Sequence, residues 1–95
     1  MNNVKALYER LRALPWPALV PKVGHCALYE SLLAGCADRM ARGAPIDVAK
    51  IPEPDDETVA YVAALRVKEA RTHDEQAFLE YFGLLEEIRS ALMGR

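Results

Sequence analysis

The chain has 95 residues, of which 52% are hydrophobic and 27% charged, and its formal net charge is -2. This length suits a single domain over residues 1–95, and the composition is too apolar for a disordered chain. The near-neutral charge gives no general attraction to nucleic acid, and no apolar run of about 18 residues could span a membrane. Lys5, Glu9 and Arg10 interrupt the apolar stretch that a secretory signal needs, so we expect a cytoplasmic protein.

The first predicted helix begins at Asn2 or Asn3, either of which can cap it, and ends before Pro15. Its apolar residues recur at helical spacing and indicate one buried face: Val4, Leu7, Leu11 and Leu14. Three prolines follow within Pro15–Pro21, so we expect a proline-rich strap between helices one and two. Trp16 in this strap either fills a corner of the bundle or offers an aromatic surface to a partner.

The second predicted helix, Gly24–Arg42, has almost no wholly polar face. Large apolar residues, together with His25, Cys26 and Cys36, fill about half of its circumference. The other half carries a stripe of small residues on which another helix could lie closely: Ala27, Ser31, Ala34 and Gly35. We therefore expect this helix to be central, covered on more than one side and packed by the other three. If the monomer leaves the stripe open, a second chain would bind there.

The connection from the second to the third helix is predicted to be an ordered crossover loop. Gly43 is placed to end the second helix in the left-handed region. The segment Ala44–Pro54 has an alternating apolar pattern but no second strand to pair with, so we expect a loop with one helical turn. The third helix runs from about Pro54 to about Arg71, with acidic residues at the positive end of its dipole.

The fourth predicted helix, Glu75–Met93, has the clearest amphipathic pattern in the chain. Thr72 and Glu75 stand at the spacing of a capping box, with Asp74 as an alternative N-cap. Large apolar residues fill one half of this helix: Phe78, Tyr81, Phe82, Leu84, Leu85, Ile88 and Leu92. Leu79 and Gly83 interrupt the polar half, whose glutamates favour a basic partner. The chain is therefore predicted to be an all-α, single-domain four-helix bundle.

No pattern in the sequence indicates catalysis or a cofactor. The residues that could hold a soft metal or act as nucleophiles stand at no ligand spacing: His25, Cys26, Cys36 and His73. Cys26 and Cys36 lie about 15 Å apart along one helix, too far for a disulfide. Helices three and four have the outline of a helix-turn-helix, but the second of them exposes glutamates where DNA phosphates would lie. We expect no enzyme activity, no metal site, and no binding to nucleic acid or membranes.

The remaining hypothesis is protein interaction, because the chain has more apolar and small packing surface than four helices need. The candidate partner-binding residues are Trp16, Ala27, Ser31, Ala34, Gly35, Leu79 and Gly83. We expect a non-enzymatic protein-protein interaction module, a small regulator or inhibitor that acts as a homodimer. The alternative is a small-ligand or metal-binding helical protein that uses His25, Cys26, Cys36 and His73.

Overall fold

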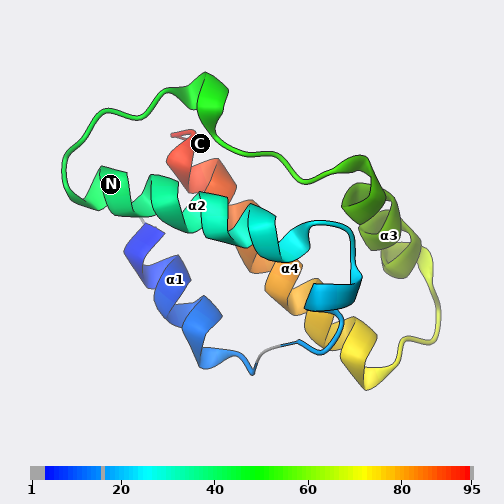
Figure 1. Cartoon of the computed structure of the whole chain (residues 1–95). Helices are drawn as coiled ribbons and strands as arrows, with labels where there is room; N and C mark the ends of the chain where they lie inside the picture. The colour runs from blue at the N-terminus through cyan, green and yellow to red at the C-terminus, as the bar shows by residue number, and fades with distance from the viewer. Residues whose placement is uncertain (1–3, 16, 95) are drawn as a thin grey trace.

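A computed structural model describes residues 4–15 and 17–94. Over these residues the chain forms four α-helices and two 3-10 turns and has no strand (Figure 1). The order is α1 (Val4–Ala13), η1 (Val20–Lys22), α2 (Cys26–Ala41), η2 (Val48–Lys50), α3 (Asp56–Val67) and α4 (His73–Leu92). The predicted all-α four-helix fold is confirmed. Trp16 and the two candidate caps of the first helix, Asn2 and Asn3, lie outside the described residues.

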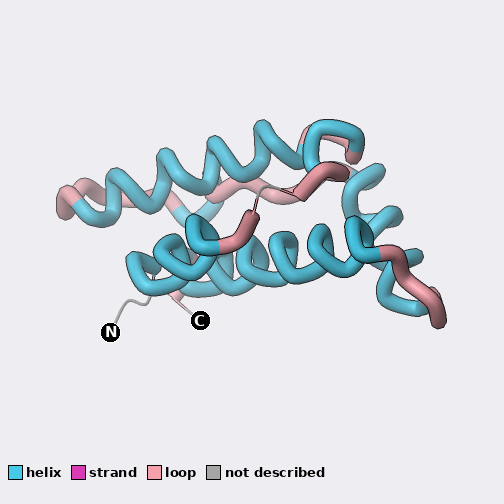
Figure 2. Tube along the Cα trace, turned by 90° about the horizontal axis from the view of Figure 1, so that it is seen from below, coloured by secondary structure: helices cyan, strands magenta, loops and turns pink. Residues whose placement is uncertain are grey.

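α4 is the centre of the fold, because each of the other three helices packs mainly against it. The side chains that α4 buries are the seven that its amphipathic pattern predicted: Phe78, Tyr81, Phe82, Leu84, Leu85, Ile88 and Leu92. α1 and α4 run in opposite directions, so that the first turn of α1 and the last turn of α4 lie at the same end of the molecule (Figures 1 and 2). The core is therefore built on the row of large side chains of α4. α1, α2 and α3 each cover a different part of that row.

The prediction that the second helix would be central and covered on more than one side is wrong. α2 buries only Cys26, Tyr29 and Leu33 fully, and its opposite half faces solvent. The physical reason lies in the size of the side chains. α4 offers three aromatic rings and four large aliphatic side chains to its neighbours, whereas the outer half of α2 offers mostly small ones. Burial of the larger apolar area is the stronger stabilising effect.

The N-terminal start of α2 differs from the prediction, whereas its C-terminal end agrees with it. α2 begins at Cys26, and Pro21 belongs to η1, because Gly24 between them has a φ of 46° that interrupts the helix. Gly43 ends the helix with a φ of 74°, as predicted. Its N–H donates to the carbonyl of Met40 over 3.0 Å, and the N–H of Ala44 donates to that of Arg39 over 3.0 Å. These two bonds form a Schellman motif that satisfies the last carbonyls of α2.

The caps of α3 and α4 follow the sequence closely. The Asp55 carboxylate accepts from the backbone N–H of Thr58 over 3.1 Å and caps α3. Thr72 and Glu75 form the predicted capping box of α4, so the alternative N-cap, Asp74, is wrong. α3 ends at Val67, about four residues earlier than predicted, because Lys68 has an extended backbone; the Arg71 guanidinium donates to the carbonyls of Leu65 and Lys68 at this end. The crossover loop contains one helical turn, η2, as expected.

Candidate functional site

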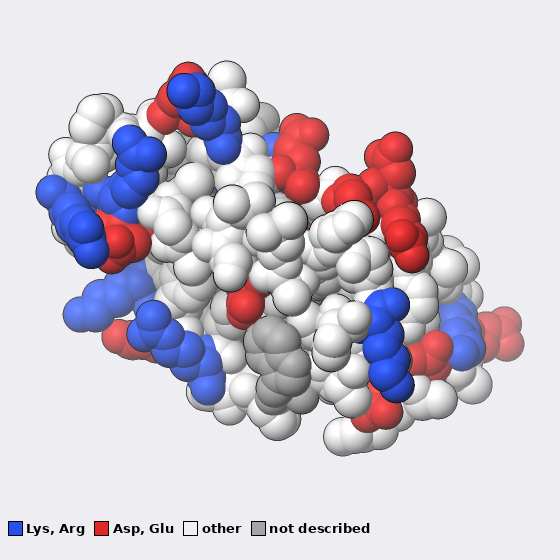
Figure 3. Space-filling view, viewed as in Figure 1, with Lys and Arg blue, Asp and Glu red and all other residues white. Residues whose placement is uncertain are grey.

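The outer face of α2 carries the small-residue stripe that the sequence predicted. All four stripe residues are exposed: Ala27, Ser31, Ala34 and Gly35. Leu28 and Leu32 lie beside the stripe with 55% and 50% of their surface exposed. Charged side chains surround a largely uncharged area over α2 in Figure 3. The monomer therefore leaves open a largely apolar surface made of these six residues, which we call the outer face of α2; Ala34 stands at its edge and also faces the gap between α2 and α1.

Leu79 and Gly83 lie beside α1, where they line a hollow of about 610 Å³ between α1 and α4. We call it the Gly83 hollow. The other apolar residues that line it are Ala13, Leu14 and Leu84. Its charged residues are all exposed: Arg10, Glu80 and Glu87. The Arg10 guanidinium lies 4.0 Å from the Glu87 carboxylate, and Glu80 forms no ion pair with a described residue. The structure thus joins two of the predicted partner-binding residues in one hollow with an acidic edge.

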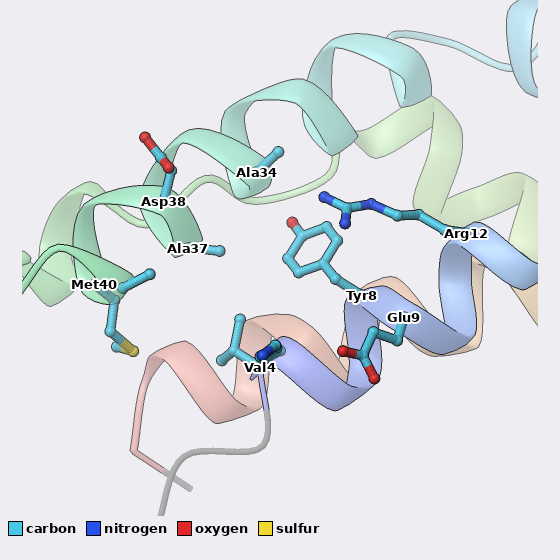
Figure 4. A pocket seen from close by; sticks show the side chains of 10 residues that line it. Val4, Tyr8, Glu9, Arg12, Ala34, Ala37, Asp38 and Met40 are labelled. Carbon is cyan, nitrogen blue, oxygen red and sulfur yellow. The ribbon is translucent and has the colours of Figure 1, made fainter.

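A groove of about 470 Å³ lies between the facing sides of α1 and α2 (Figure 4). Val4 and Tyr8 line it from α1. The lining from α2 is mostly small: Ala34, Ala37, Met40 and Ala41, beside Asp38. A smaller hollow of about 330 Å³ shares Tyr8 with this groove and extends to Glu30. The groove exists because α1 and α2 each pack mainly on α4 and not on each other.

Two polar side chains, Tyr8 at this groove and Glu30 at the smaller hollow beside it, are partly buried, which the sequence does not predict. The Tyr8 hydroxyl oxygen is buried with no hydrogen-bond partner among the described residues, and burial raises the pKa of Tyr8 to about 12. Burial also raises the pKa of the Glu30 carboxyl above its usual value, which the neighbouring Tyr81 hydroxyl partly offsets. None of the ion pairs between described residues includes Glu30. Tyr8 and Glu30 belong to different helices, so no local spacing indicates that they approach each other.

Replacing Tyr8 with phenylalanine is expected to raise the free energy of unfolding by about 1 kcal/mol, because it removes a buried hydroxyl that has no partner. Urea unfolding followed by circular dichroism measures this change. Tyr61→Phe is the comparison, at a half-buried ring of α3, and is expected to change stability by less than about 0.5 kcal/mol. A loss of stability in Tyr8→Phe would mean that the hydroxyl is hydrogen-bonded to ordered water.

The structure does not bring the histidines and cysteines together. His25 is exposed, with its Nδ1 atom 3.2 Å from Oδ2 of Asp55. Cys26 is buried, and burial raises the pKa of its thiol to about 11. Cys36 is half-buried and unpaired, and His73 is exposed at the first position of α4. Across residues 4–15 and 17–94, no three histidine, cysteine, aspartate or glutamate side chains are grouped so that they could hold a metal ion.

Comparisons of the chain with protein-family models, with curated proteins and with solved structures find no match. None of the helices in the described part of the chain has the length and apolar character needed to cross a membrane. The function is therefore inferred from this chain's own surfaces.

Proposed function

We propose that this protein is a non-enzymatic protein-protein interaction module that pairs with a second copy of itself through the outer face of α2. The observation that supports this most directly is the exposure of the small-residue stripe together with Leu28 and Leu32. On a small protein, a continuous apolar surface of this kind usually marks the contact with a partner or a second copy. The homodimer would act as a small regulator or inhibitor of a larger protein through the surfaces that it leaves free.

The order of residues along α2 suits a self-complementary contact. In an antiparallel pairing centred on Ser31, Ala27 of one copy lies opposite Gly35 of the other, and the reverse holds across the twofold axis. Small side chains at these positions allow the two helices to approach closely. The charged residues of α2, which begin at Asp38 and Arg39 on this side, lie beyond the centre of the contact. Pairing therefore brings no like charges together at its centre.

The expected strength of this contact follows from its size. α2 has 16 residues and is therefore about 24 Å long. A contact through one helix of this length is smaller than the standard interface of about 800 Å² on each partner. We accordingly propose a reversible dimer whose population depends on protein concentration.

Two further parts of the proposal, the non-enzymatic role and the cytoplasmic location, concern the cysteines. A thiol with a pKa of about 11, such as that of Cys26, is protonated near neutral pH and is a poor nucleophile, which supports a non-enzymatic role. We also propose a cytoplasmic location, in which the thiols of Cys26 and Cys36 stay reduced; their separation along α2 keeps them from pairing with each other.

Sedimentation velocity over a range of protein concentrations tests the dimer. The wild-type chain should shift from monomer to dimer as its concentration rises, and Ser31→Arg should remain a monomer because a long charged side chain enters the centre of the contact. Ser90→Arg is the matched control, because Ser90 is an exposed serine on α4, away from the outer face of α2. The proposal is wrong if the wild type stays monomeric throughout, or if Ser31→Arg associates as strongly as Ser90→Arg.

A further inference from the structure

We infer that the Gly83 hollow is a docking site for an amphipathic helix of another protein that carries two basic residues seven positions apart. This inference rests on the proposed function only in assigning the chain to protein binding. It concerns a different surface, between α1 and α4, and a different partner from the second copy proposed for α2.

The hollow has an apolar lining on which one face of a partner helix can rest. Its volume is about 610 Å³, and Leu14, Leu79 and Leu84 give it apolar walls. Helix-in-groove recognition uses such a surface, because the apolar face of the incoming helix is buried there. The affinity would come mainly from this burial, since exposed ion pairs contribute little by themselves.

Gly83 leaves room that no part of the described chain uses. A Cβ atom added at Gly83 would have no other atom within 4 Å, apart from its own helix backbone and chain neighbours. Glycine in the interior of a helix is less favourable than alanine, so the fold gains nothing from it at this position. The same gap allows another helix to approach the backbone of α4 closely. The absence of a side chain at Gly83 therefore leaves this part of the hollow unfilled.

The charges beside Gly83 indicate the chemistry of the partner. Glu80 and Glu87 stand two helical turns apart on α4, about 10.5 Å along its axis, with Gly83 between them. Both carboxylates are exposed; Glu80 has no ion pair with a described residue, and Glu87 has only the 4.0 Å contact with Arg10. An incoming helix with arginine or lysine at the same spacing places one cation beside each carboxylate. Such complementarity mainly determines the register and the choice of partner.

A second copy of this chain is a poorer fit than another protein. The only two basic residues seven positions apart in the sequence are Lys5 and Arg12. Both line the groove on the α2 side of α1. Binding of these two residues of α1 in the Gly83 hollow of a second copy would be a head-to-tail contact, in which each copy uses two different surfaces. Such contacts propagate from copy to copy into rings or filaments. We therefore assign the hollow to another protein.

The test uses a synthetic peptide of about 18 residues, long enough to form a helix in water, with a leucine and alanine face and two arginines seven positions apart. A matched peptide carries glutamates in place of the arginines. Fluorescence anisotropy of the labelled peptides measures binding to the full-length chain. The arginine peptide should bind the wild type and the glutamate peptide should not.

Three variants of the chain locate the site. Gly83→Leu places a large side chain at the hollow, where its Cβ atom meets no other atom within 4 Å, and should weaken binding of the arginine peptide on the order of tenfold or more. The double variant Glu80→Lys with Glu87→Lys should lose the arginine peptide and bind the glutamate peptide instead. Gly35→Leu is the matched control, because Gly35 is also a helical glycine with no atom within 4 Å of an added Cβ, but lies on α2. It should bind the arginine peptide as the wild type does. Circular dichroism checks that each variant is folded.

Each outcome decides the inference separately from the proposed dimer. Absence of binding to the wild type, unchanged binding to Gly83→Leu, or equal binding of both peptides would overturn the docking site. The same Gly35→Leu variant should lose self-association in sedimentation while it keeps the peptide site. A chain that binds the arginine peptide but never dimerises would contradict the proposed dimer and leave the docking site standing.

Discussion

Replacing Phe78 with alanine is expected to lower the free energy of unfolding by about 3 to 5 kcal/mol. Phe78 is fully buried on α4, and its ring meets those of three other residues. The ring centroids lie 5.5 Å from Tyr61 of α3, 6.2 Å from Tyr81 and 6.1 Å from Phe82. Alanine leaves a cavity in the place where α3 attaches to α4. Since small domains are stable by only about 5 to 15 kcal/mol, this one change removes a large share of the stability.

Urea unfolding at neutral pH measures the effect, and Val67→Ala on α3 is its control. Val67 is 82% exposed, so its truncation should change stability by less than about 0.5 kcal/mol. A loss of less than about 1 kcal/mol in Phe78→Ala would contradict the close aromatic packing that joins α3 to α4.

Replacing Gly24 with alanine is expected to cost about 2 kcal/mol or more, which is unusual for a residue outside any helix. Gly24 has a φ of 46°, a left-handed conformation that alanine adopts with strain. Its Cβ atom would also lie 2.7 Å from Oγ1 of Thr58 and 2.8 Å from Oδ2 of Asp55. Those atoms belong to the N-cap of α3, where the Thr58 hydroxyl and backbone N–H both donate to the Asp55 carboxylate. The substitution therefore has two effects at once: it strains the backbone before α2, and it displaces the N-cap of α3.

Gly43→Ala separates these two causes. Gly43 has a φ of 74°, but a Cβ atom there has no neighbour within 4 Å. Alanine at position 43 should therefore cost only the backbone strain, about 1 kcal/mol. Thermal or urea unfolding of both variants compares them directly. Equal losses at positions 24 and 43 would show that the close approach of Gly24 to Asp55 and Thr58 has no energetic role.

The sequence predicted α4 well because its pattern is local and unambiguous. Large residues recur on one half of the helix, glutamates occupy much of the other, and Thr72 with Glu75 marks its start. The Gly43 cap was predictable for the same reason, since a glycine that follows a helix favours one backbone conformation. Such features depend on residues a few positions apart, and the rest of the fold does not alter them.

The role of α2 could not be predicted because its composition allows two arrangements. A helix with apolar or small residues all round is either covered on several sides or leaves an apolar face open, and its own residues do not distinguish these cases. The distinction depends on whether another helix has enough large side chains to be the centre, as α4 does. The Gly83 hollow and the hollow that Tyr8 and Glu30 share depend in turn on where α1 lies beside α4 and α2. The sequence identifies Leu79 and Gly83 as candidate residues, but it does not predict that they lie beside α1.

The central position of α4 also affects how the molecule opens. α1, α2 and α3 each pack mainly against α4, and α2 also packs against η1, so we expect the outer helices to open locally more readily than α4. Amide hydrogens in the middle of α4 then exchange with solvent only when the whole molecule unfolds. Those of the outer helices exchange through smaller and separate openings, which makes α4 the slowest-exchanging segment of the chain.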